Sequence, residues 1–351
     1  MLNQKDETVS NQKPDILLIY TGGTIGMFRD YRSGTLKAFD FAKLLDQIPE
    51  LQQLDCRIHS VSLQKPIDSS NMDLAQWQEI AGLIASHYEA YDGFVVLHGS
   101  DTMSYTASAL SFMLENLAKP VVLTGSQLPI GDLRTDAKEN LITSVQMAAL
   151  NENGRPLIQE VCLYFEFKLY RGNRTSKMNT EHFEAFDSPN YPALASSGVH
   201  LKVHREYLWQ PVTTRPLKLH TRLDNRIGIL KLFPGMNPDW VGNLLRSPGL
   251  RAVILETFGA GNAPTSPWLI QAFKEAVASG LYLVNVTQCR GGSVLMGRYE
   301  TSATLRDIPL IDGRDITTEA ALAKLMYLLG EEVSHKSFKT IFETSLRGEM
   351  S

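Results

Sequence analysis

Short apolar runs alternate with longer amphipathic stretches over the first 165 residues of the chain. Short apolar runs predict buried strands, and apolar residues that recur every three or four positions predict helices that pack against them. The predicted strands cover 15–20, 94–97, 121–124 and 157–165, and a segment of mixed pattern covers 58–63. The predicted helices cover 73–87, 105–117 and 136–149, and an amphipathic stretch covers 39–51. Strands that alternate with helices predict a parallel sheet with helices on both faces.

The alternation stops between about 191 and 224, a stretch rich in Pro, Arg, His and Thr that we interpret as a linker with extended parts. It then resumes on a smaller scale, where Asn237 is placed to cap a helix and Pro238 is tolerated in its first turn. The predicted elements of this second unit are strands at 227–232, 252–255 and 281–286 and helices at 238–245, 267–278 and 317–329.

The expected fold class is therefore α/β, with two α/β domains that each contain a parallel-type sheet. The larger N-terminal domain is expected at 14–195 and carries most of the candidate site, and the smaller C-terminal domain is expected at 225–351. A disordered polar lead is expected at 1–13 and a linker at 196–224.

Length and composition are those of a soluble globular protein with two domains of ordinary size. The 351 residues carry a net charge of −4 without any block of like charge, which gives no electrostatic basis for binding nucleic acid or a membrane surface. Cys56, Cys162 and Cys289 are far apart and odd in number, so neither a disulfide framework nor a metal clip is predicted, and the histidines show no metal-ligand spacing. The polar N-terminus lacks the apolar core of a secretory signal, and no apolar run approaches about 18 residues, so we expect a cytoplasmic protein.

Two predicted strands run directly into glycine-containing loops that each carry hydroxyl side chains. The strand at 15–20 is followed by 21–26 (Thr-Gly-Gly-Thr-Ile-Gly), and the strand at 94–97 is followed by 98–102 (His-Gly-Ser-Asp-Thr). Because loops beyond the carboxyl ends of parallel strands form the ligand crevice, the two loops predict one site built around a nucleophilic hydroxyl. Neither loop has the spacing of a nucleotide-binding motif. An ordinary glycine turn, or a helix cap formed by the hydroxyls after Asp101, remains the alternative interpretation.

Two further polar segments are ambiguous when they are considered alone. The segment 66–72 (Pro-Ile-Asp-Ser-Ser-Asn-Met) offers small polar groups, but its spacing favours a cap and a turn. The segment 170–177 (Tyr-Arg-Gly-Asn-Arg-Thr-Ser-Lys) carries three basic residues, which are usually part of a solvated surface.

The order of these segments resembles that of one enzyme family. The two hydroxyl loops, the Asp-Ser-Ser segment and the basic segment occur in series with 124–127 (Thr-Gly-Ser-Gln), 259–264 (Gly-Ala-Gly-Asn-Ala-Pro) and 287–289 (Thr-Gln-Cys). The series resembles the bacterial-type L-asparaginases, specifically their cytoplasmic type I branch, from about residue 14 to 346. The resemblance implies a two-domain α/β fold, a homodimer or homotetramer, and hydrolysis of L-asparagine to L-aspartate and ammonia without a metal or other cofactor.

The resemblance also implies roles for individual residues. Thr24 would be the nucleophile, and Ser100, Asp101 and Lys177 would form the accompanying catalytic group. The positions that the resemblance implies for substrate binding are Asp68, Ser69, Ser70, Gly99 and Ser126. A hydroxyl needs a neighbouring base to become a good nucleophile, and a lysine can be that base only where burial or nearby cations lower its pKa. An aspartate beside the lysine would instead favour the ammonium form, so the order of attack by the two hydroxyls stays open.

The chain departs from the family pattern in both of its glycine loops. The family's second loop usually reads His-Gly-Thr-Asp-Thr, whereas this chain has Ser100 at the central position and so lacks the methyl group that restricts the rotamer of threonine. The loop after the nucleophile usually supplies a tyrosine to a lid, but here Thr35 stands at that position and Tyr31 lies earlier in the loop. We expect a lid hydroxyl from one of these two residues.

A third departure concerns regulation by asparagine, which some type I enzymes bind at a separate site through an arginine. This chain has Glu256 at that position, although Thr287 and Cys289 of the site remain. A carboxylate cannot pair with the carboxylate of an effector, so we expect a weak or absent allosteric response. Glu300 is a candidate contact to the substrate amine of a neighbouring subunit, and an exposed loop acid is the alternative.

Three other functions compete with an asparagine-specific enzyme. An asparaginase with glutaminase activity is one, because an extra methylene group changes binding by only about 1–3 kcal/mol. The amidase subunit of a tRNA-dependent amidotransferase shares the catalytic domain but has an extra N-terminal domain, and only about fourteen polar residues precede the first predicted strand here. A non-catalytic amino-acid sensor on the same fold would not require the hydroxyls and the lysine together.

Overall fold

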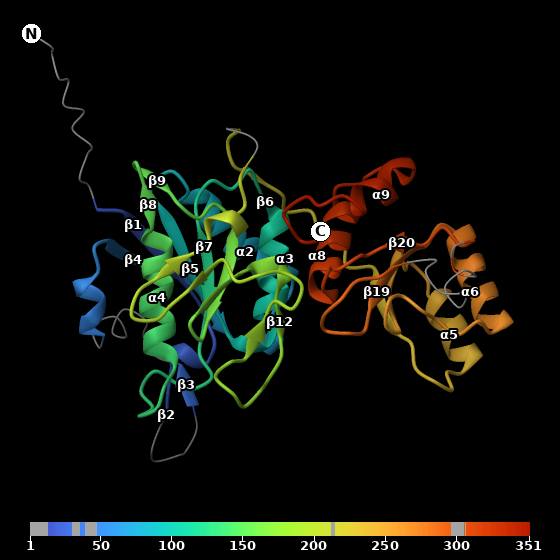
Figure 1. The fold of residues 1–351 in the computed structure, drawn as a ribbon, viewed down its shortest axis with the longest axis horizontal. Helices are drawn as coiled ribbons and strands as arrows, with labels where there is room; N and C mark the ends of the chain where they lie inside the picture. The colour runs from blue at the N-terminus through green and yellow to red at the C-terminus, as the bar shows by residue number, and fades with distance from the viewer. Residues whose placement is uncertain (1–12, 30–35, 39–47, 212–214, 296–304, 306) are drawn as a thin grey trace, which may run out of the picture.

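In a computed structural model the chain forms two α/β domains that lie beside each other (Figure 1). The structure describes residues 13–29, 36–38, 48–211, 215–295, 305 and 307–351. Most of the predicted lead at 1–13 and of the amphipathic stretch at 39–51 lies outside the described residues.

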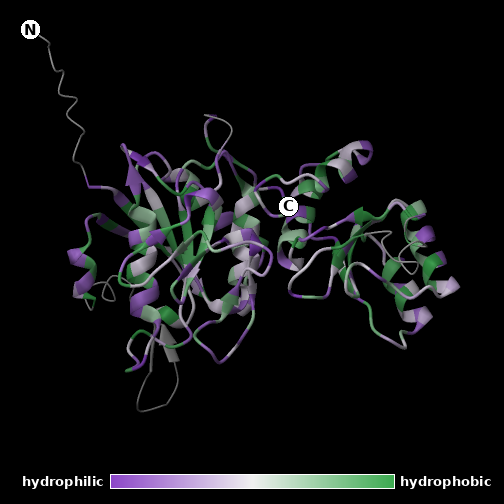
Figure 2. Cartoon of the chain, viewed as in Figure 1, coloured by the Kyte–Doolittle hydropathy of each residue, from purple (hydrophilic) through white to green (hydrophobic). Residues whose placement is uncertain are grey.

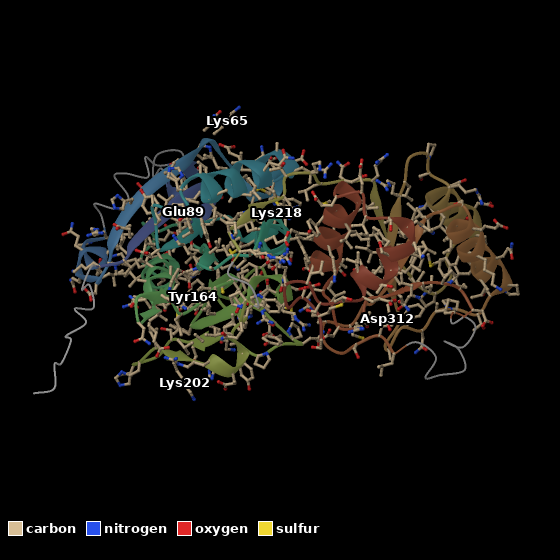
Figure 3. All side chains as sticks on the ribbon, turned by 90° about the horizontal axis from the view of Figure 1, so that it is seen from above. Lys65, Glu89, Tyr164, Lys202, Lys218 and Asp312 are labelled. Carbon is tan, nitrogen blue, oxygen red and sulfur yellow. The ribbon has the colours of Figure 1, made fainter. Side chains whose placement is uncertain are left out.

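The N-terminal domain is built on an eight-stranded sheet in the order β15-β14-β11-β10-β7-β5-β1-β4. In that order the strands are Lys202–Val203, Ala195–Ser196, Lys168–Arg171, Val161–Phe165, Val121–Thr124, Gly93–Leu97, Asp15–Gly22 and Arg57–Ile67. The five strands from β10 to β4 are parallel, as predicted, and the remaining three are antiparallel. Figure 3 shows Lys65 and Lys202 at opposite outer faces of this domain, on the two edge strands, with Tyr164 inside. Charged side chains on edge strands disfavour pairing with other chains.

Helices cover both faces of this sheet, as the alternating pattern predicts. Helices α2 (Leu74–Ser86) and α3 (Met103–Met113) pack on one face, and α4 (Ala137–Ala149) packs on the other. Successive residues of β1 point to opposite faces, so each face has its own apolar core. Asp73 caps α2 with a capping box, so the helix predicted at 73–87 begins at Leu74.

Two predicted elements of this domain have wrong boundaries. The helix predicted at 105–117 ends at Met113, because Leu114–Glu115 forms strand β6 and pairs with β16 (Lys218–Leu219). That pairing joins segments about a hundred residues apart, which local periodicity does not detect. The strand predicted at 157–165 begins at Val161, because Arg155–Pro156 (β9) turns back onto β8 (Asn151–Glu152).

The C-terminal domain has a four-stranded parallel sheet between two helical layers. Its strands are β17 (Ile227–Lys231), β18 (Ala252–Thr257), β19 (Tyr282–Thr287) and β20 (Ile311–Asp312), and its helices are α5 (Pro238–Leu245), α6 (Pro267–Ala278), α8 (Thr318–Gly330) and α9 (His335–Phe342). Helices α5 and α6 have the predicted bounds. The Asn237 side chain caps α5, as predicted, by accepting a hydrogen bond from the Trp240 N–H. Helix α9 was not predicted. Figure 2 shows hydrophobic residues concentrated along the central strands and the helix surfaces that cover them.

Helix α8 connects the two domains. It lies against α3 of the N-terminal domain (Figure 1), where the rings of Tyr327 and Phe112 stack with centroids 5.9 Å apart. Three short strand pairs complete the fold: β2 (Met27–Arg29) with β3 (Leu36–Ala38), β8 with β9, and β12 (Ser176–Lys177) with β13 (Phe186–Asp187). Strand β12 matters most for function, because it carries the candidate lysine.

Candidate active site

The two glycine loops are in direct backbone contact at the carboxyl ends of β1 and β5. Gly23 has φ of +83°, and a Cβ atom there would lie 2.5 Å from the Cα and N atoms of Gly99. Gly22 has φ of +120°, and its Cβ atom would lie 2.0 Å from the carbonyl oxygen of Ile67. L-amino acids with side chains rarely adopt this backbone conformation, so glycine is required both by conformation and by space. The turn brings Thr24, half-buried in the following 3-10 turn Thr24–Gly26, to the same end of the sheet as Ser100.

The Asp-Ser-Ser segment lies at the same end of the sheet. The Thr102 hydroxyl donates to the carbonyl oxygen of Ser69 at 2.7 Å, and a Cβ atom on Gly99 would lie 2.4 Å from Ser69 Oγ. Asp68 accepts hydrogen bonds from the backbone N–H and the hydroxyl of Ser70 at 2.9 and 2.8 Å. These bonds, the backbone one first, hold the pKa of the exposed Asp68 carboxyl below its usual value. The segment therefore forms the predicted cap and turn and also presents an anion beside the glycine loops.

Ser100, Asp101 and Lys177 form a hydrogen-bonded cluster. Lys177 Nζ donates to Ser100 Oγ at 2.8 Å and to Asp101 Oδ1 at 2.7 Å. The lysine side chain is 17% exposed and that of Asp101 is 61% exposed, so the cluster lies at the mouth of the site. The structure thus brings the lysine to an aspartate that is 76 positions away along the chain.

The interpretation of 170–177 as a solvated surface is wrong. Arg171 and Arg174 are 4% and 2% exposed, because each guanidinium is paired with a buried acid. Arg171 Nε lies 2.6 Å from Glu160 Oε2, and Arg174 Nη1 lies 2.9 Å from Asp315 Oδ2. Arg171 also lies over the ring of Tyr191. The two arginines therefore fix the backbone that leads to Lys177 and are not solvated themselves.

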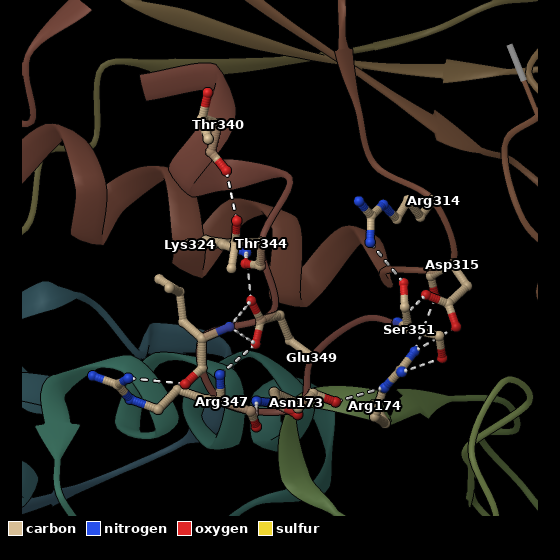
Figure 4. Close-up of polar contacts among 12 residues, drawn as sticks. Asn173, Arg174, Arg314, Asp315, Lys324, Thr340, Thr344, Arg347, Glu349 and Ser351 are labelled. Atoms are coloured by element: carbon tan, nitrogen blue, oxygen red, sulfur yellow. Dashed lines mark hydrogen bonds and ion pairs between the residues drawn. The ribbon is translucent and has the colours of Figure 1, made fainter. Parts of the chain in front are cut away.

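The C-terminal segment 344–351 packs against this same backbone (Figure 4). Arg174 Nε donates to the carbonyl oxygen of Gly348 at 2.8 Å, and Asn173 Nδ2 donates to that of Arg347 at 3.0 Å. The segment is itself anchored by a fully buried ion pair between Glu349 and Lys324 of α8. The Glu349 carboxylate also accepts from the N–H groups of 346 and 347, so the buried charge has several partners.

Helix α8 contacts β12, the strand of Lys177, through the carboxylate of Glu319. Glu319 Oε2 accepts a hydrogen bond from the hydroxyl of Ser176, the neighbour of Lys177, at 3.0 Å. Burial raises the pKa of Glu319 above its usual value. Glu256, at the carboxyl end of β18, bonds to the Thr318 hydroxyl at 2.8 Å and pairs with Lys231 at 3.2 Å. The Glu256 carboxylate, at the position where the resemblance implies an arginine, thus makes its bonds within the C-terminal domain.

The other two residues of the expected regulatory site also make local contacts. The Thr287 hydroxyl donates to the carbonyl oxygen of Gly259 at 2.6 Å and accepts from the N–H of the exposed Cys289 at 3.0 Å.

Two residues without a role in the sequence analysis contribute to the second glycine loop. His98 is fully buried; its Nδ1 lies 2.7 Å from the carbonyl oxygen of Gly99 and its Nε2 lies 2.9 Å from the Thr106 hydroxyl. Burial lowers the pKa of His98 to about 4. Gln127 accepts a hydrogen bond from Ser100 Oγ at 3.2 Å. Both residues lie in a loop that directly follows a predicted strand, and that position was the only sign in the sequence that they could belong to the site. It does not show which groups they bond to.

The remaining candidate residues are either committed to local bonds or outside the described structure. Ser126 is buried, and its hydroxyl donates to the carbonyl oxygen of Leu128 at 2.6 Å. Tyr31, Thr35 and Glu300 lie outside the described residues. Within the residues described, no group of three or more His, Cys, Asp or Glu side chains is placed to hold a metal ion. In the same part of the chain no helix is both long and apolar enough to cross a membrane.

Both halves of the chain are similar to known proteins. The family model "Asparaginase, N-terminal" matches residues 15–209, and "Glutaminase/Asparaginase C-terminal domain" matches residues 226–342. L-asparaginase 1 of Escherichia coli is 41% identical over 350 residues, which cover 97% of this chain and 99% of that protein. One subunit of the glutamyl-tRNA(Gln) amidotransferase of Metallosphaera sedula is 33% identical over 95% of this chain and 76% of its own length. The crystal structure of L-asparaginase I from Vibrio cholerae aligns with a TM-score of 0.87 at 41% identity, covering 97% of this chain and 99% of that one.

Proposed function

Since the chain belongs to the asparaginase family, we propose that it hydrolyses the side-chain amide of L-asparagine to L-aspartate and ammonia. The family relationship covers both domains and extends over almost the whole length of a relative named L-asparaginase 1. The observation that carries the proposal is the Ser100–Asp101–Lys177 cluster beside the loop of Thr24, because a lysine amine and two hydroxyls lie at one end of the sheet.

In the proposed reaction Thr24 Oγ attacks the amide carbon of the substrate. The hydroxyl proton passes to the site base and then to the leaving nitrogen, so ammonia departs and an ester joins the acyl group to Thr24. Water then attacks the ester carbon, which releases aspartate and restores the hydroxyl. Lys177, in its neutral form, is the proposed base and lies 2.8 Å from Ser100 Oγ. The proton passes through that hydroxyl when the Ser100 hydrogen turns from Gln127 Oε1 to the lysine nitrogen while Ser100 Oγ stays in place.

The proposed binding of the substrate follows from charge and from available donors. Asp68 stays anionic because Ser70 donates to it, which suits the α-ammonium group. Backbone N–H groups in the loops at 22–24 and 99–100 are the proposed donors to the amide oxygen as it becomes an oxyanion. Removal of one such donor typically raises a barrier by about 2.7–4 kcal/mol. Ser69 and Gly99 would shape the pocket between these groups.

The decisive measurement is ammonia release from asparagine and from glutamine by the pure protein. We expect turnover of asparagine, and we expect Thr24→Ala, Ser100→Ala and Lys177→Met each to reduce it by orders of magnitude. Lys336→Met removes an exposed lysine on α9 and serves as the matched control, with folding checked by circular dichroism.

Each other outcome contradicts a part of the proposal. Tight binding of asparagine without ammonia release would favour a sensor over an enzyme. Near-normal turnover after any of the three substitutions would exclude that residue from the chemistry. Comparable specificity constants for the two amides would make the protein a mixed asparaginase and glutaminase, which is compatible with the description of the C-terminal family model.

We also propose that the protein works in the cytoplasm as a homodimer or homotetramer. All three cysteines are free and Cys289 is exposed, which suits a reducing compartment. Light scattering coupled to gel filtration would test the oligomeric state, and a purely monomeric active enzyme would contradict it.

A further inference from the structure

We propose that Gln127 is a positioning residue that fixes the hydroxyl group of Ser100 for the reaction. The proposal rests on the function proposed above, in which Ser100 takes part in proton transfer. Ser100 Oγ donates to Gln127 Oε1 at 3.2 Å and receives a hydrogen bond from Lys177 Nζ at 2.8 Å. The two contacts together define both where the oxygen lies and where its hydrogen points.

A serine hydroxyl needs such an acceptor more than a threonine hydroxyl does. Serine has a single heavy atom on Cβ, so all three staggered χ1 rotamers are open to it, and its hydrogen rotates to suit its surroundings. Asp101 does not restrict Ser100 directly, since its carboxylate contacts the lysine instead. Gln127 and Lys177 therefore select the rotamer of Ser100 together, and Gln127 is the one of the two that accepts its hydrogen.

Gln127 can act in this way because its own amide is fixed. Its Nε2 donates to the carbonyl oxygen of His182 at 3.1 Å. The opposite orientation of the amide would place two oxygen atoms against each other, so the carbonyl of His182 determines that Oε1 faces Ser100. Since His182 lies in the loop that follows the strand of Lys177, Gln127 bridges the loop of the hydroxyl and the loop after the lysine strand.

The backbone of Gln127 is held as well. The carboxylate of Asp136, at the start of α4, accepts from the N–H of Gln127 at 2.9 Å and from the N–H of Leu128 at 3.1 Å. Asn140, one turn later, donates to the same carboxylate at 3.3 Å and to the carbonyl oxygen of Gly125 at 3.0 Å. Asp136 and Asn140 are buried, so the loop that presents Gln127 is attached to the rigid core of the domain.

A double-mutant cycle between positions 127 and 100 tests the proposal. Gln127→Met keeps the length of the side chain but removes the acceptor, and Ser100→Thr adds a methyl group that restricts χ1 without the help of Gln127. We expect Gln127→Met to lower kcat about tenfold with KM nearly unchanged, as suits the loss of one hydrogen bond that orients a reacting group. In the Ser100→Thr background the same substitution should lower kcat by a factor of about three or less.

Controls separate a positioning role from a structural one. Gln159→Met is the matched control, because Gln159 is also half-buried and also donates to a carbonyl oxygen, that of Pro156, away from the site. Gln127→Leu provides a second variant without the acceptor, should the methionine variant fail to fold. Thermal unfolding of each variant identifies losses of activity that follow from lost structure.

The outcomes of the cycle are distinct from those that test the function itself. An equal loss of kcat in the Ser100 and Ser100→Thr backgrounds would overturn the proposal, because Gln127 would then act independently of the serine rotamer. No loss in the Ser100 background would overturn it as well. Full turnover by Ser100→Ala would instead contradict the proposed role of Ser100 in catalysis, whatever Gln127 does.

Discussion

Acid should destabilise the N-terminal domain through His98, which lies at the base of the second glycine loop. The ring is fully buried and bonded at both nitrogens. The carbonyl oxygen of Gly99 can only accept, so Nδ1 carries the hydrogen and Nε2 accepts from Thr106. Trp77 Nε1 in turn donates to the Thr106 hydroxyl at 2.9 Å. The chain of bonds fits the neutral imidazole. A second proton at Nε2 would displace the hydrogen that the Thr106 hydroxyl donates to the ring and would place a positive charge in a fully buried position.

The expected magnitude follows from the two pKa values of His98. Burial lowers the pKa to about 4 in the folded protein, whereas a histidine in the unfolded chain has a pKa near 6.5. Between these values the unfolded chain binds a proton that the folded protein does not bind, so the free energy of unfolding falls as the pH falls. At 1.36 kcal/mol for each pKa unit, His98 should remove roughly 3 kcal/mol between pH 6.5 and pH 4, and its contribution is complete above pH 6.5.

Urea unfolding at a series of pH values, followed by tryptophan fluorescence, measures this effect. His98→Asn cannot titrate, so its free energy of unfolding should fall by roughly 3 kcal/mol less than that of the wild type over the same pH range. The variant will be less stable at neutral pH, since Thr106 loses its acceptor. His335→Asn removes an exposed histidine and should behave as the wild type does. If His98→Asn lost as much stability in acid as the wild type, the reasoning would be refuted.

Three more predictions concern the site and its supports. Lys324→Met leaves the buried Glu349 carboxylate without its cation and should lower the free energy of unfolding by about 3–5 kcal/mol in urea titrations, and adding Glu349→Gln should recover much of the loss. Gly23→Ala should abolish turnover in the ammonia assay, because its Cβ atom would overlap the second loop. Gly154→Ala is the control, because Gly154 has φ of +75° but open space around it. This variant should stay active, and its loss of stability measures the strain of an alanine in that backbone conformation without any steric overlap. Because Glu256 stands where the resemblance implies an effector-binding arginine, we expect the rate to depend hyperbolically on asparagine concentration, and a sigmoidal curve would contradict this.

The sequence allowed good prediction of those elements whose signals are local. Asn237 and Pro238 mark the start of α5 unambiguously, and its observed bounds are the predicted ones. The central parallel strands β1, β5, β7 and β10 were predictable from their continuous apolar runs, since both of their faces are covered. The parallel edge strand β4 is largely exposed and gave only a mixed pattern. By contrast β14 and β15 have two residues each and exist only because β11 offers them an edge. No local pattern can predict such strands.

The candidate site divides in the same way. The meeting of the two glycine loops could be inferred, because the carboxyl ends of neighbouring parallel strands share one edge. The burial of Arg171 and Arg174 could not, because the acids that accompany them, Glu160 and Asp315, lie 11 and 141 positions away. A charged residue with no local partner is normally exposed, and only the tertiary structure shows that these two are paired.

These contacts explain why a site built almost entirely from the N-terminal domain depends on the C-terminal one. Ser100 and Asp101 are held by β5 and α3, whereas the strand of Lys177 pairs with β13 of its own domain and is also held by contacts from the C-terminal domain. Ser176 bonds to Glu319, and Arg174 bonds to Asp315. The 2.8 Å distance between Lys177 Nζ and Ser100 Oγ therefore depends on how the two domains pack against each other. An error of about 1 Å at a reacting group can cost about a hundredfold in rate. If Lys177 and Ser100 act as proposed, a change in the packing of α8 against α3 should therefore lower the rate as well.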